Sequence, residues 1–133
     1  MKSIFTKIIA GEIHAYKISE NASCITILDA FPLRLGHTLV IPKMEIDIWH
    51  HLPESQYFSI MQEAFRVAQA IAKVIPCNRV SQHIIGLEVP HAHLHLIPIN
   101  SIKDCDFRAP KPTFTPAQFQ ATALSIQSAL TPL

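Results

Sequence analysis

The stretch His91-Ala92-His93-Leu94-His95-Leu96-Ile97-Pro98 is the most regular pattern in the chain. Side chains alternate across a β-strand, so we expect the three imidazoles to share one face and the leucines to share the other. The leucine face can pack against a helix, whereas clustered imidazoles gain nothing from packing because they repel one another when charged. The pattern therefore predicts a strand at about residues 90–98 with core on one side and chemistry on the other.

The segment before this strand predicts a long helix. Apolar residues recur every three or four positions between Pro53 and Ile75, which places them on one stripe of a helix. Pro53 suits the first helical turn, and Pro76 stops the far end. The stripe indicates a helix over residues 53–75 that packs against a core.

Shorter patterns complete the expected fold. Thr115 and Gln118 match a capping box with a proline between them, which predicts a second helix. Alternating and β-branched runs predict strands, the first two joined by a turn at residues 19–22. The expected elements are strands at 14–18, 23–29, 38–41 and 79–85 and a helix at 116–130. With the histidine strand they make an α+β fold, a five-stranded mainly antiparallel sheet with one long helix and a C-terminal helix.

Composition limits the classes of partner. The 133 residues are 49% apolar and 16% charged, which predicts one domain over residues 1–133. The formal charge is +1, so we expect neither nucleic acid nor a membrane surface as a partner. Lys7 interrupts the apolar amino terminus before it reaches the length of a signal peptide or a membrane span. Three scattered cysteines are typical of a reducing compartment, and we expect a cytoplasmic protein.

The clustered histidines are compatible with two kinds of chemistry. A metal site is one, but His91 and His95 would lie roughly 13 Å apart at Cα on a straight strand, too far to bind one ion together. The other is attack on phosphorus by a neutral imidazole whose second nitrogen donates to a fixed acceptor. His93 is flanked by histidines on both sides and is the best candidate for that attack.

Three blocks of the chain resemble one protein family. Residues 91–98 resemble the motif of the histidine triad (HIT) nucleotide hydrolases and transferases. Residues 4–13, and 27–32 together with 36–43, resemble two further blocks of that family in the same order. The resemblance covers a motif region of about residues 1–100 and leaves a C-terminal helical extension at about 103–133. It implies a HIT-like fold, a homodimer, and a nucleotidyl-histidine intermediate formed on a purine nucleotide or nucleotide conjugate.

The same resemblance assigns roles to individual residues. It implies that His93 is the nucleophile, that His91 and His95 bind and orient the phosphate and the nucleophile, and that His37 supports the triad. Asp29 matches a residue that binds the ribose hydroxyls, which suits a carboxylate. Glu88 matches the position of a leaving-group donor. The remaining implied substrate-binding residues, mostly the wall of the base pocket, are Ile4, Phe5, Ile8, Ile27, Leu28 and Val89.

Some features leave the activity open. Thr6 stands where some family members carry a zinc-binding cysteine, so we expect no metal site and no obligatory cofactor, although a divalent cation could accompany a polyphosphate substrate. Leu87 replaces a glutamine that contacts phosphates in the family. The substrate could be a nucleoside phosphoramidate, a dinucleoside polyphosphate or another nucleotide conjugate. The alternatives are a nucleotide-binding module with little turnover and a histidine-ligated metal site.

Overall fold

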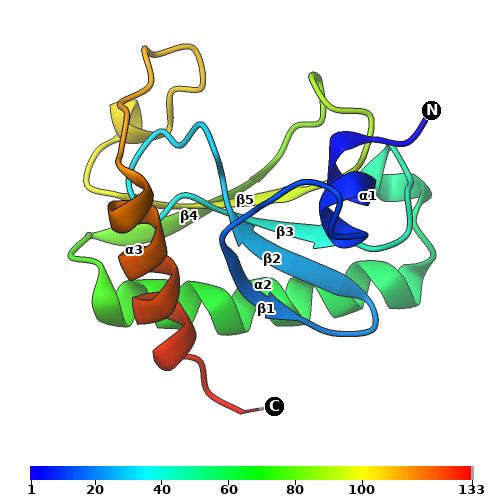
Figure 1. Cartoon of the computed structure of the whole chain (residues 1–133), viewed down its shortest axis with the longest axis horizontal. Helices are drawn as coiled ribbons and strands as arrows, with labels where there is room; N and C mark the ends of the chain where they lie inside the picture. Colours follow the sequence, from blue (N-terminus) through cyan, green and yellow to red (C-terminus); the bar gives the residue numbers. More distant parts are fainter. Residues whose placement is uncertain (133) are drawn as a thin grey trace.

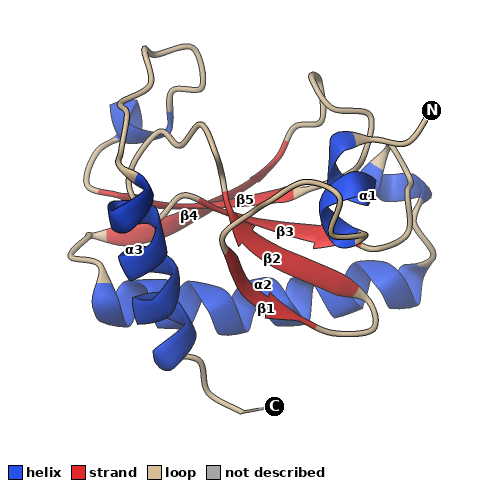
Figure 2. Cartoon of the chain, in the orientation of Figure 1, coloured by secondary structure: helices blue, strands red, loops and turns tan. Residues whose placement is uncertain are grey.

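Five antiparallel strands form one sheet in the order β1-β2-β3-β5-β4 in a computed structural model that describes residues 1–132 (Figures 1 and 2). The strands are β1 (Lys17–Glu20), β2 (Cys24–Leu28), β3 (Thr38–Pro42), β4 (Arg79–Ile84) and β5 (Leu94–Ile99). The helices are α1 (Ile4–Ile9), α2 (Glu54–Val74) and α3 (Pro116–Ser128), with short 3-10 turns η1 (Trp49–His51) and η2 (Ile102–Cys105). The α+β fold with a five-stranded sheet is the one expected.

The long helix α2 covers one face of the sheet (Figure 2). Its buried residues Ile60, Ala64, Val67 and Ile71 follow a spacing of four, three and four, so they lie on one stripe. The predicted helix over 53–75 is confirmed to within one residue at each end, and Pro53 is the N-cap residue. In the folded protein, burial of that stripe against the sheet stabilises the helix.

The helix α3 completes the cover on the same face. The side chain of Thr115 accepts a hydrogen bond from the Gln118 amide, and the Gln118 side chain accepts one from the Thr115 amide. The predicted start at residue 116 is confirmed, whereas the helix ends at Ser128 instead of residue 130. Tyr16 and Phe119 stack with ring centroids 5.2 Å apart, which joins α3 to the segment that enters β1.

The first hairpin is displaced from its expected position. The Asn21 side-chain oxygen accepts hydrogen bonds from the amides of Ser23 and Cys24, at 2.8 and 2.9 Å. Asn21 therefore starts the turn by itself, as asparagine commonly does. Ser19 and Glu20, which were expected in the turn, remain in β1.

The histidine strand is shorter than expected. β5 starts at Leu94, so His91 and His93 lie in the segment that leads into it. The paired residues of β3 and β5 are Thr38 to Val40 opposite Leu96 to Leu94. Upstream of that ladder the Ala92 amide donates instead to the Ile46 carbonyl at 2.7 Å, because the chain there follows the loop after β3.

The two faces of the sheet differ in what covers them. The helix face, under α2 and α3, receives apolar side chains from β2, β3 and β5, among them Leu28, Val40 and Leu96. The histidine face, on the opposite side, carries a smaller apolar cluster beneath α1: Phe5, Ile25, Ile27, Leu39 and Ile41. His95 lies directly opposite Leu39 in the ladder and therefore shares the histidine face.

A glycine occupies the turn before β3. Gly36 has a φ of +103°, and a Cβ atom there would lie 2.2 Å from Ile75 Cδ1 at the end of α2. Any other residue at this position would strain the backbone and require the Ile75 side chain to move. None of the helices within residues 1–132 combines the length and apolar composition that spanning a lipid bilayer requires.

Candidate active site

The ring of His93 is held in one tautomer. Its Nδ1 lies 2.8 Å from the backbone carbonyl oxygen of His91. A carbonyl oxygen only accepts, so Nδ1 carries the proton and the lone pair is on Nε2. Burial lowers the pKa of His93, which keeps the ring neutral near pH 7. A neutral imidazole with a free Nε2 lone pair is a nucleophile.

His95 is oriented by a chain of hydrogen bonds that starts at a backbone amide. The Leu33 amide donates to His37 Nδ1 at 3.0 Å, so His37 carries its proton on Nε2. His37 Nε2 lies 2.9 Å from His95 Nδ1 and donates to it. His95 must then carry its own proton on Nε2, where it can donate to an anionic ligand. The supporting position expected for His37 is consistent with this geometry.

The electrostatics agree with this proton order. Burial lowers the pKa of His37 to about 4 and that of His95 to about 3, with the mutual repulsion of the rings adding to the effect at His95. Both rings are therefore neutral near pH 7.

Among residues 1–132, Thr26 Oγ1 is the only fully buried side-chain N or O atom without a hydrogen-bond partner. The Nε2 atoms of His93 and His95, for which residues 1–132 supply no partner, therefore reach solvent.

Asp29 lies beside this chain at the end of β2. Its Oδ2 is 3.4 Å from His37 Nε2, and its Oδ1 accepts from the Phe31 amide at 2.9 Å. The side chain is 18% exposed, and each carboxylate oxygen keeps a further lone pair. Asp29 can therefore still accept hydrogen bonds from hydroxyl groups of a ligand.

Asp29, His37 and His95 bring three potential metal-binding atoms within 4.8 Å of one another. The donor set does not fit a metal, because His37 Nδ1 already accepts from the Leu33 amide and its proton is on Nε2. An ion at Nε2 would require the ring to lose its remaining proton or to give up the Leu33 bond. The geometry favours a hydrogen-bonded relay of neutral groups.

The expected role of His91, to bind and orient the phosphate and the nucleophile, stays a prediction. Its ring is fully buried, with Nδ1 2.7 Å from Ser3 Oγ and Nε2 2.8 Å from the Pro42 carbonyl oxygen. Both ring nitrogens are thus engaged by protein groups, whereas the His91 carbonyl oxygen contacts His93 Nδ1.

The residues expected in a base pocket are only partly brought together. Phe5, Ile8, Ile27 and Val89 meet in the apolar cluster of the histidine face, and the Phe5 and His93 ring centroids are 4.8 Å apart. Leu28 is a correction: it packs into the core of the helix face, because neighbouring residues of a strand point to opposite faces.

Three other positions lie at the margin of the site. Ile4 is 47% exposed and lies outside the apolar cluster, since it is on the outer side of α1. Leu87 and Glu88 lie exposed in the loop between β4 and β5, and Leu87 keeps 89% of its surface. The structure thus places Glu88 at a solvent-facing position. Its charge raises the pKa of His93 slightly, against the larger effect of burial.

Phe107, which sequence patterns did not indicate, covers the histidines. Its ring centroid lies 4.9 Å from that of His95, 6.1 Å from that of His37 and 5.4 Å from that of His83. The side-chain ammonium of Lys111 donates to the Phe107 carbonyl at 3.1 Å. Phe107 follows η2 in the C-terminal extension, where no periodic pattern marks it.

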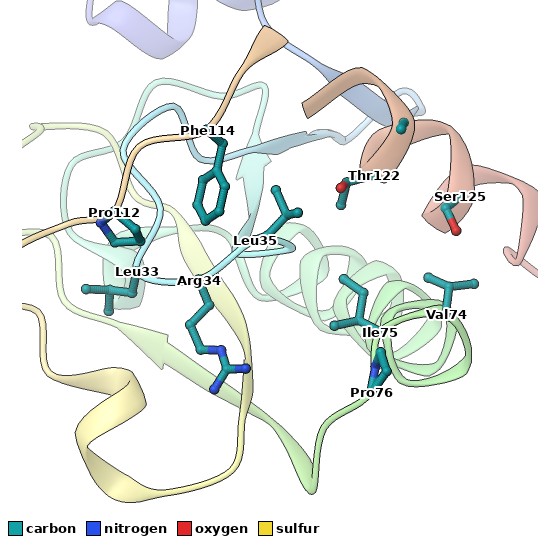
Figure 3. A pocket seen from close by; sticks show the side chains of 11 residues that line it. Leu33, Arg34, Leu35, Val74, Ile75, Pro76, Pro112, Phe114, Thr122 and Ser125 are labelled. Carbon is teal, nitrogen blue, oxygen red and sulfur yellow. The ribbon is translucent and has the colours of Figure 1, made fainter. Parts of the chain in front are cut away.

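A cavity of about 790 Å³ lies elsewhere, between the loop before β3, the end of α2 and α3 (Figure 3). Arg34, Ile75 and Phe114 are among its lining residues, and no triad histidine is among them within residues 1–132. Arg34 is already paired with Asp104 at 2.7 Å. The cavity is therefore separate from the histidine chemistry.

Comparisons with known proteins find relatives over most of the chain. The profile of the HIT domain matches residues 10–102. A HIT-like protein of Mycoplasma genitalium is 37% identical over 100 residues, 71% of each chain. An adenosine 5′-monophosphoramidase of Schizosaccharomyces pombe is 34% identical over 102 residues, 74% of each chain.

Solved structures with a similar fold also exist. A Hit-like protein of Bartonella henselae superposes with a TM-score of 0.85 at 24% identity, covering 97% of this chain and 96% of its own. The TM-score supports the fold, and the family profile spans more than two thirds of the sequence. This chain therefore belongs to the histidine triad (HIT) family.

Proposed function

We propose that the protein is a nucleotide hydrolase or transferase that works through a nucleotidyl adduct on His93. The observation that carries the proposal is the 2.8 Å contact between His93 Nδ1 and the His91 carbonyl oxygen, which leaves Nε2 unprotonated beside an exposed donor on His95. This arrangement supplies a nucleophile and a phosphate-binding proton on one face of the sheet.

The proposed reaction has two displacements at the α-phosphorus. His93 Nε2 attacks phosphorus, an N–P bond forms, and the bond to the leaving group breaks with its electron pair, which takes a proton from solvent. The ring becomes positively charged, and the His91 carbonyl stabilises this charge through the Nδ1 proton. Water or another acceptor then attacks phosphorus, releases its proton to solvent, and returns neutral His93 with the nucleotide product.

The surrounding residues suit the parts of a nucleotide. The Nε2 proton of His95 would bind a phosphoryl oxygen, and Asp29 would accept from the ribose hydroxyls. The apolar cluster of Phe5, Ile8, Ile27 and Val89 would receive the base. Because Phe107 covers His37 and His95, we propose that residues 1–133 act as one domain in which the C-terminal extension completes the site.

The relative from Schizosaccharomyces pombe supports a nucleoside phosphoramidate as the first substrate to examine. A dinucleoside polyphosphate, with or without a divalent cation, is the second substrate to examine.

The three cysteines, Cys24, Cys77 and Cys105, are free in the structure, which suits a cytoplasmic protein.

We further propose a homodimer. The strand order leaves one edge of β4 unpaired, and unpaired edges are surfaces on which a second chain can add a strand. The helix α2 exposes 58% of Phe58 and 69% of Phe65, seven residues apart and so on one side of the helix. Phe65→Glu should shift sedimentation from dimer to monomer, whereas Leu124→Glu, at an exposed site on α3, should not; a wild-type monomer would contradict the proposal.

Intact-protein mass spectrometry tests the chemistry. Wild type and His93→Ala are mixed briefly with an adenosine phosphoramidate or a diadenosine polyphosphate and quenched, and turnover is followed separately. We expect an acid-labile adenylate increment on wild type alone, and product release only by wild type. Nucleotide binding without increment or turnover would favour a binding module instead. Turnover by His93→Ala at the wild-type rate would exclude His93 as the nucleophile.

A further inference from the structure

Four polar groups meet at the amino terminus, at the base of α1. Ser3 is the N-cap of α1, where its Oγ accepts from the Thr6 amide at 3.0 Å. The same Oγ lies 2.7 Å from His91 Nδ1. The carboxylate of Glu45 accepts from the Ser3 amide at 2.7 Å and from the Thr6 hydroxyl at 2.6 Å. Ser3 is only 8% exposed and His91 is fully buried, whereas Glu45 lies exposed at the surface.

The direction of each hydrogen bond follows from the acceptors. The Pro42 carbonyl oxygen can only accept, so His91 carries a proton on Nε2. In the neutral ring Nδ1 is then an acceptor, and the proton it receives is that of the Ser3 hydroxyl. The Thr6 hydroxyl, followed by the Ser3 amide, lowers the pKa of Glu45 to about 2, which keeps this carboxylate an acceptor. Ser3 therefore accepts from α1 and donates to His91.

This arrangement compensates for a missing element of the sheet. β5 begins at Leu94, so the carbonyl group of His91 has no place in the strand ladder. The backbone there is tied only by the His91 amide to the Val89 carbonyl at 2.8 Å and by the Ala92 amide to Ile46. The His91 ring is hydrogen-bonded at both nitrogens and so supplies a third attachment between this backbone and the rest of the protein. The carbonyl that selects the tautomer of His93 thus depends on a side-chain contact with residue 3.

We propose that Ser3 is a positioning residue for the nucleophile: its hydroxyl clamps His91 against Pro42 and thereby aims the His91 carbonyl at His93 Nδ1. The inference deepens the proposed function and rests on His93 being the group that attacks. Glu45 supports the clamp by holding the Ser3 amide and the Thr6 hydroxyl, so that the Ser3 hydroxyl proton is directed to His91.

The clamp can be separated from the capping of α1 by two variants of the full chain. Ser3→Thr keeps both the cap and the hydroxyl donor. Ser3→Gly keeps most of the cap, because glycine is also a favourable N-cap residue, but it has no hydroxyl to donate to His91 Nδ1. A role in helix capping alone would be preserved in both variants, whereas the clamp would be preserved only in the threonine variant.

The first readout does not require activity. Imidazole ¹⁵N spectra and water exchange of the His93 Nδ1 proton are measured in wild type and both variants. We expect wild type and Ser3→Thr to show an acceptor-type Nδ1 on His91 and slow exchange at His93. In Ser3→Gly, His91 Nδ1 loses this donor, so His93 exchange should accelerate. Unchanged exchange at His93 in Ser3→Gly would overturn the proposal even if wild type formed no adduct.

The second readout is the rate of adduct formation with an adenosine phosphoramidate, with AMP affinity measured separately. We expect Ser3→Gly to slow adduct formation roughly ten- to hundredfold, as misplacement of a reacting group does, and Ser3→Thr to stay within about twofold of wild type. AMP affinity should stay within about twofold in both, since Ser3 would not contact the nucleotide. A wild-type rate in Ser3→Gly would refute the clamp. Absence of any adduct on wild type would instead refute the proposed function.

Discussion

The two faces of the sheet are built on different principles, although the same strands supply both. The helix face buries a continuous set of apolar side chains under α2 and α3, each touching several others. The histidine face contributes its apolar residues to a small cluster under α1, and each of its histidines is held by one or two hydrogen bonds to defined partners. Apolar burial is non-directional, whereas a hydrogen bond fixes one atom against another. The helix face therefore supplies stability and the histidine face supplies geometry.

Neighbouring residues on β5 allow the sharpest comparison. Leu96 is 1% exposed on the helix face, and Leu96→Ala should lower the free energy of unfolding by about 2–5 kcal/mol through lost burial and a cavity. Chemical denaturation measures this change. Leu124→Ala, at an exposed position of α3, is the control and should change stability by less than about 0.5 kcal/mol. A loss below about 1 kcal/mol at Leu96 would show that the helix face repacks freely.

His95, one residue earlier, should respond in the opposite way. His95→Leu keeps an equivalent volume but removes the Nε2 donor, so adduct formation should slow by roughly 10²–10³-fold. The free energy of unfolding should fall much less than in Leu96→Ala, because the His37 proton can turn to Asp29, which lies 3.4 Å away. Rapid-quench kinetics and denaturation on the same sample test both parts. A wild-type rate would remove His95 from the phosphate site.

The two faces should also differ in their response to acid. The pKa values of His37 and His95 are lowered in the native state to about 4 and about 3, from the 6.5 expected of an unfolded chain. Below pH 6.5 the unfolded chain binds protons that the native protein does not, so stability falls as pH falls. The slope is at most about 1.4 kcal/mol per pH unit for each proton.

Urea midpoints between pH 7.5 and pH 4.5 would measure this slope. In the same series His95→Leu should give a shallower slope, because one buried group that resists protonation has been removed. Leu96→Ala should shift the whole curve downward and leave its slope unchanged. Equal slopes in wild type and His95→Leu would mean that the buried histidines do not control acid stability.

The smallest effect is expected at a thiol. Cys24 is 1% exposed on the helix face, and burial raises its pKa to about 11, so the reactive thiolate is scarce. Under native conditions iodoacetamide should modify the half-exposed Cys77 and Cys105 and spare Cys24, with little effect on adduct formation. Peptide mapping identifies the modified thiols. Rapid native labelling of Cys24 would show that the helix face opens locally.

The fold was predictable where a pattern repeats along the sequence. The spacing of Ile60, Ala64, Val67 and Ile71 requires only the helical repeat, and the capping box of α3 is a signal within four residues. The hairpin was displaced because the hydrogen bonds of Asn21 decide where the strand stops, and propensity does not contain that information. β5 started late for a similar reason, since an extended pattern does not reveal whether a partner strand is present.

The site was predictable only as far as the triad and its family resemblance reach. The proton order of His37 depends on the Leu33 amide, and the engagement of His91 depends on Ser3, 88 residues away. Leu28 was placed in the base pocket by the family resemblance alone, and because all five residues of β2 are buried, no alternation of burial separates it from Ile27. Phe107 reaches the histidines by tertiary folding alone.

The strand order has a kinetic consequence. The bond between His37 and His95 joins residues 58 apart, and α2 and β4 lie between them in the chain. The β1–β2 hairpin and α2 can form from local contacts, whereas the His37–His95 bond must wait for β3 to pair with β5 around that long loop. During refolding the helical circular dichroism signal should thus return before the capacity to form an adduct. A newly synthesised chain would therefore form its helices before its active site.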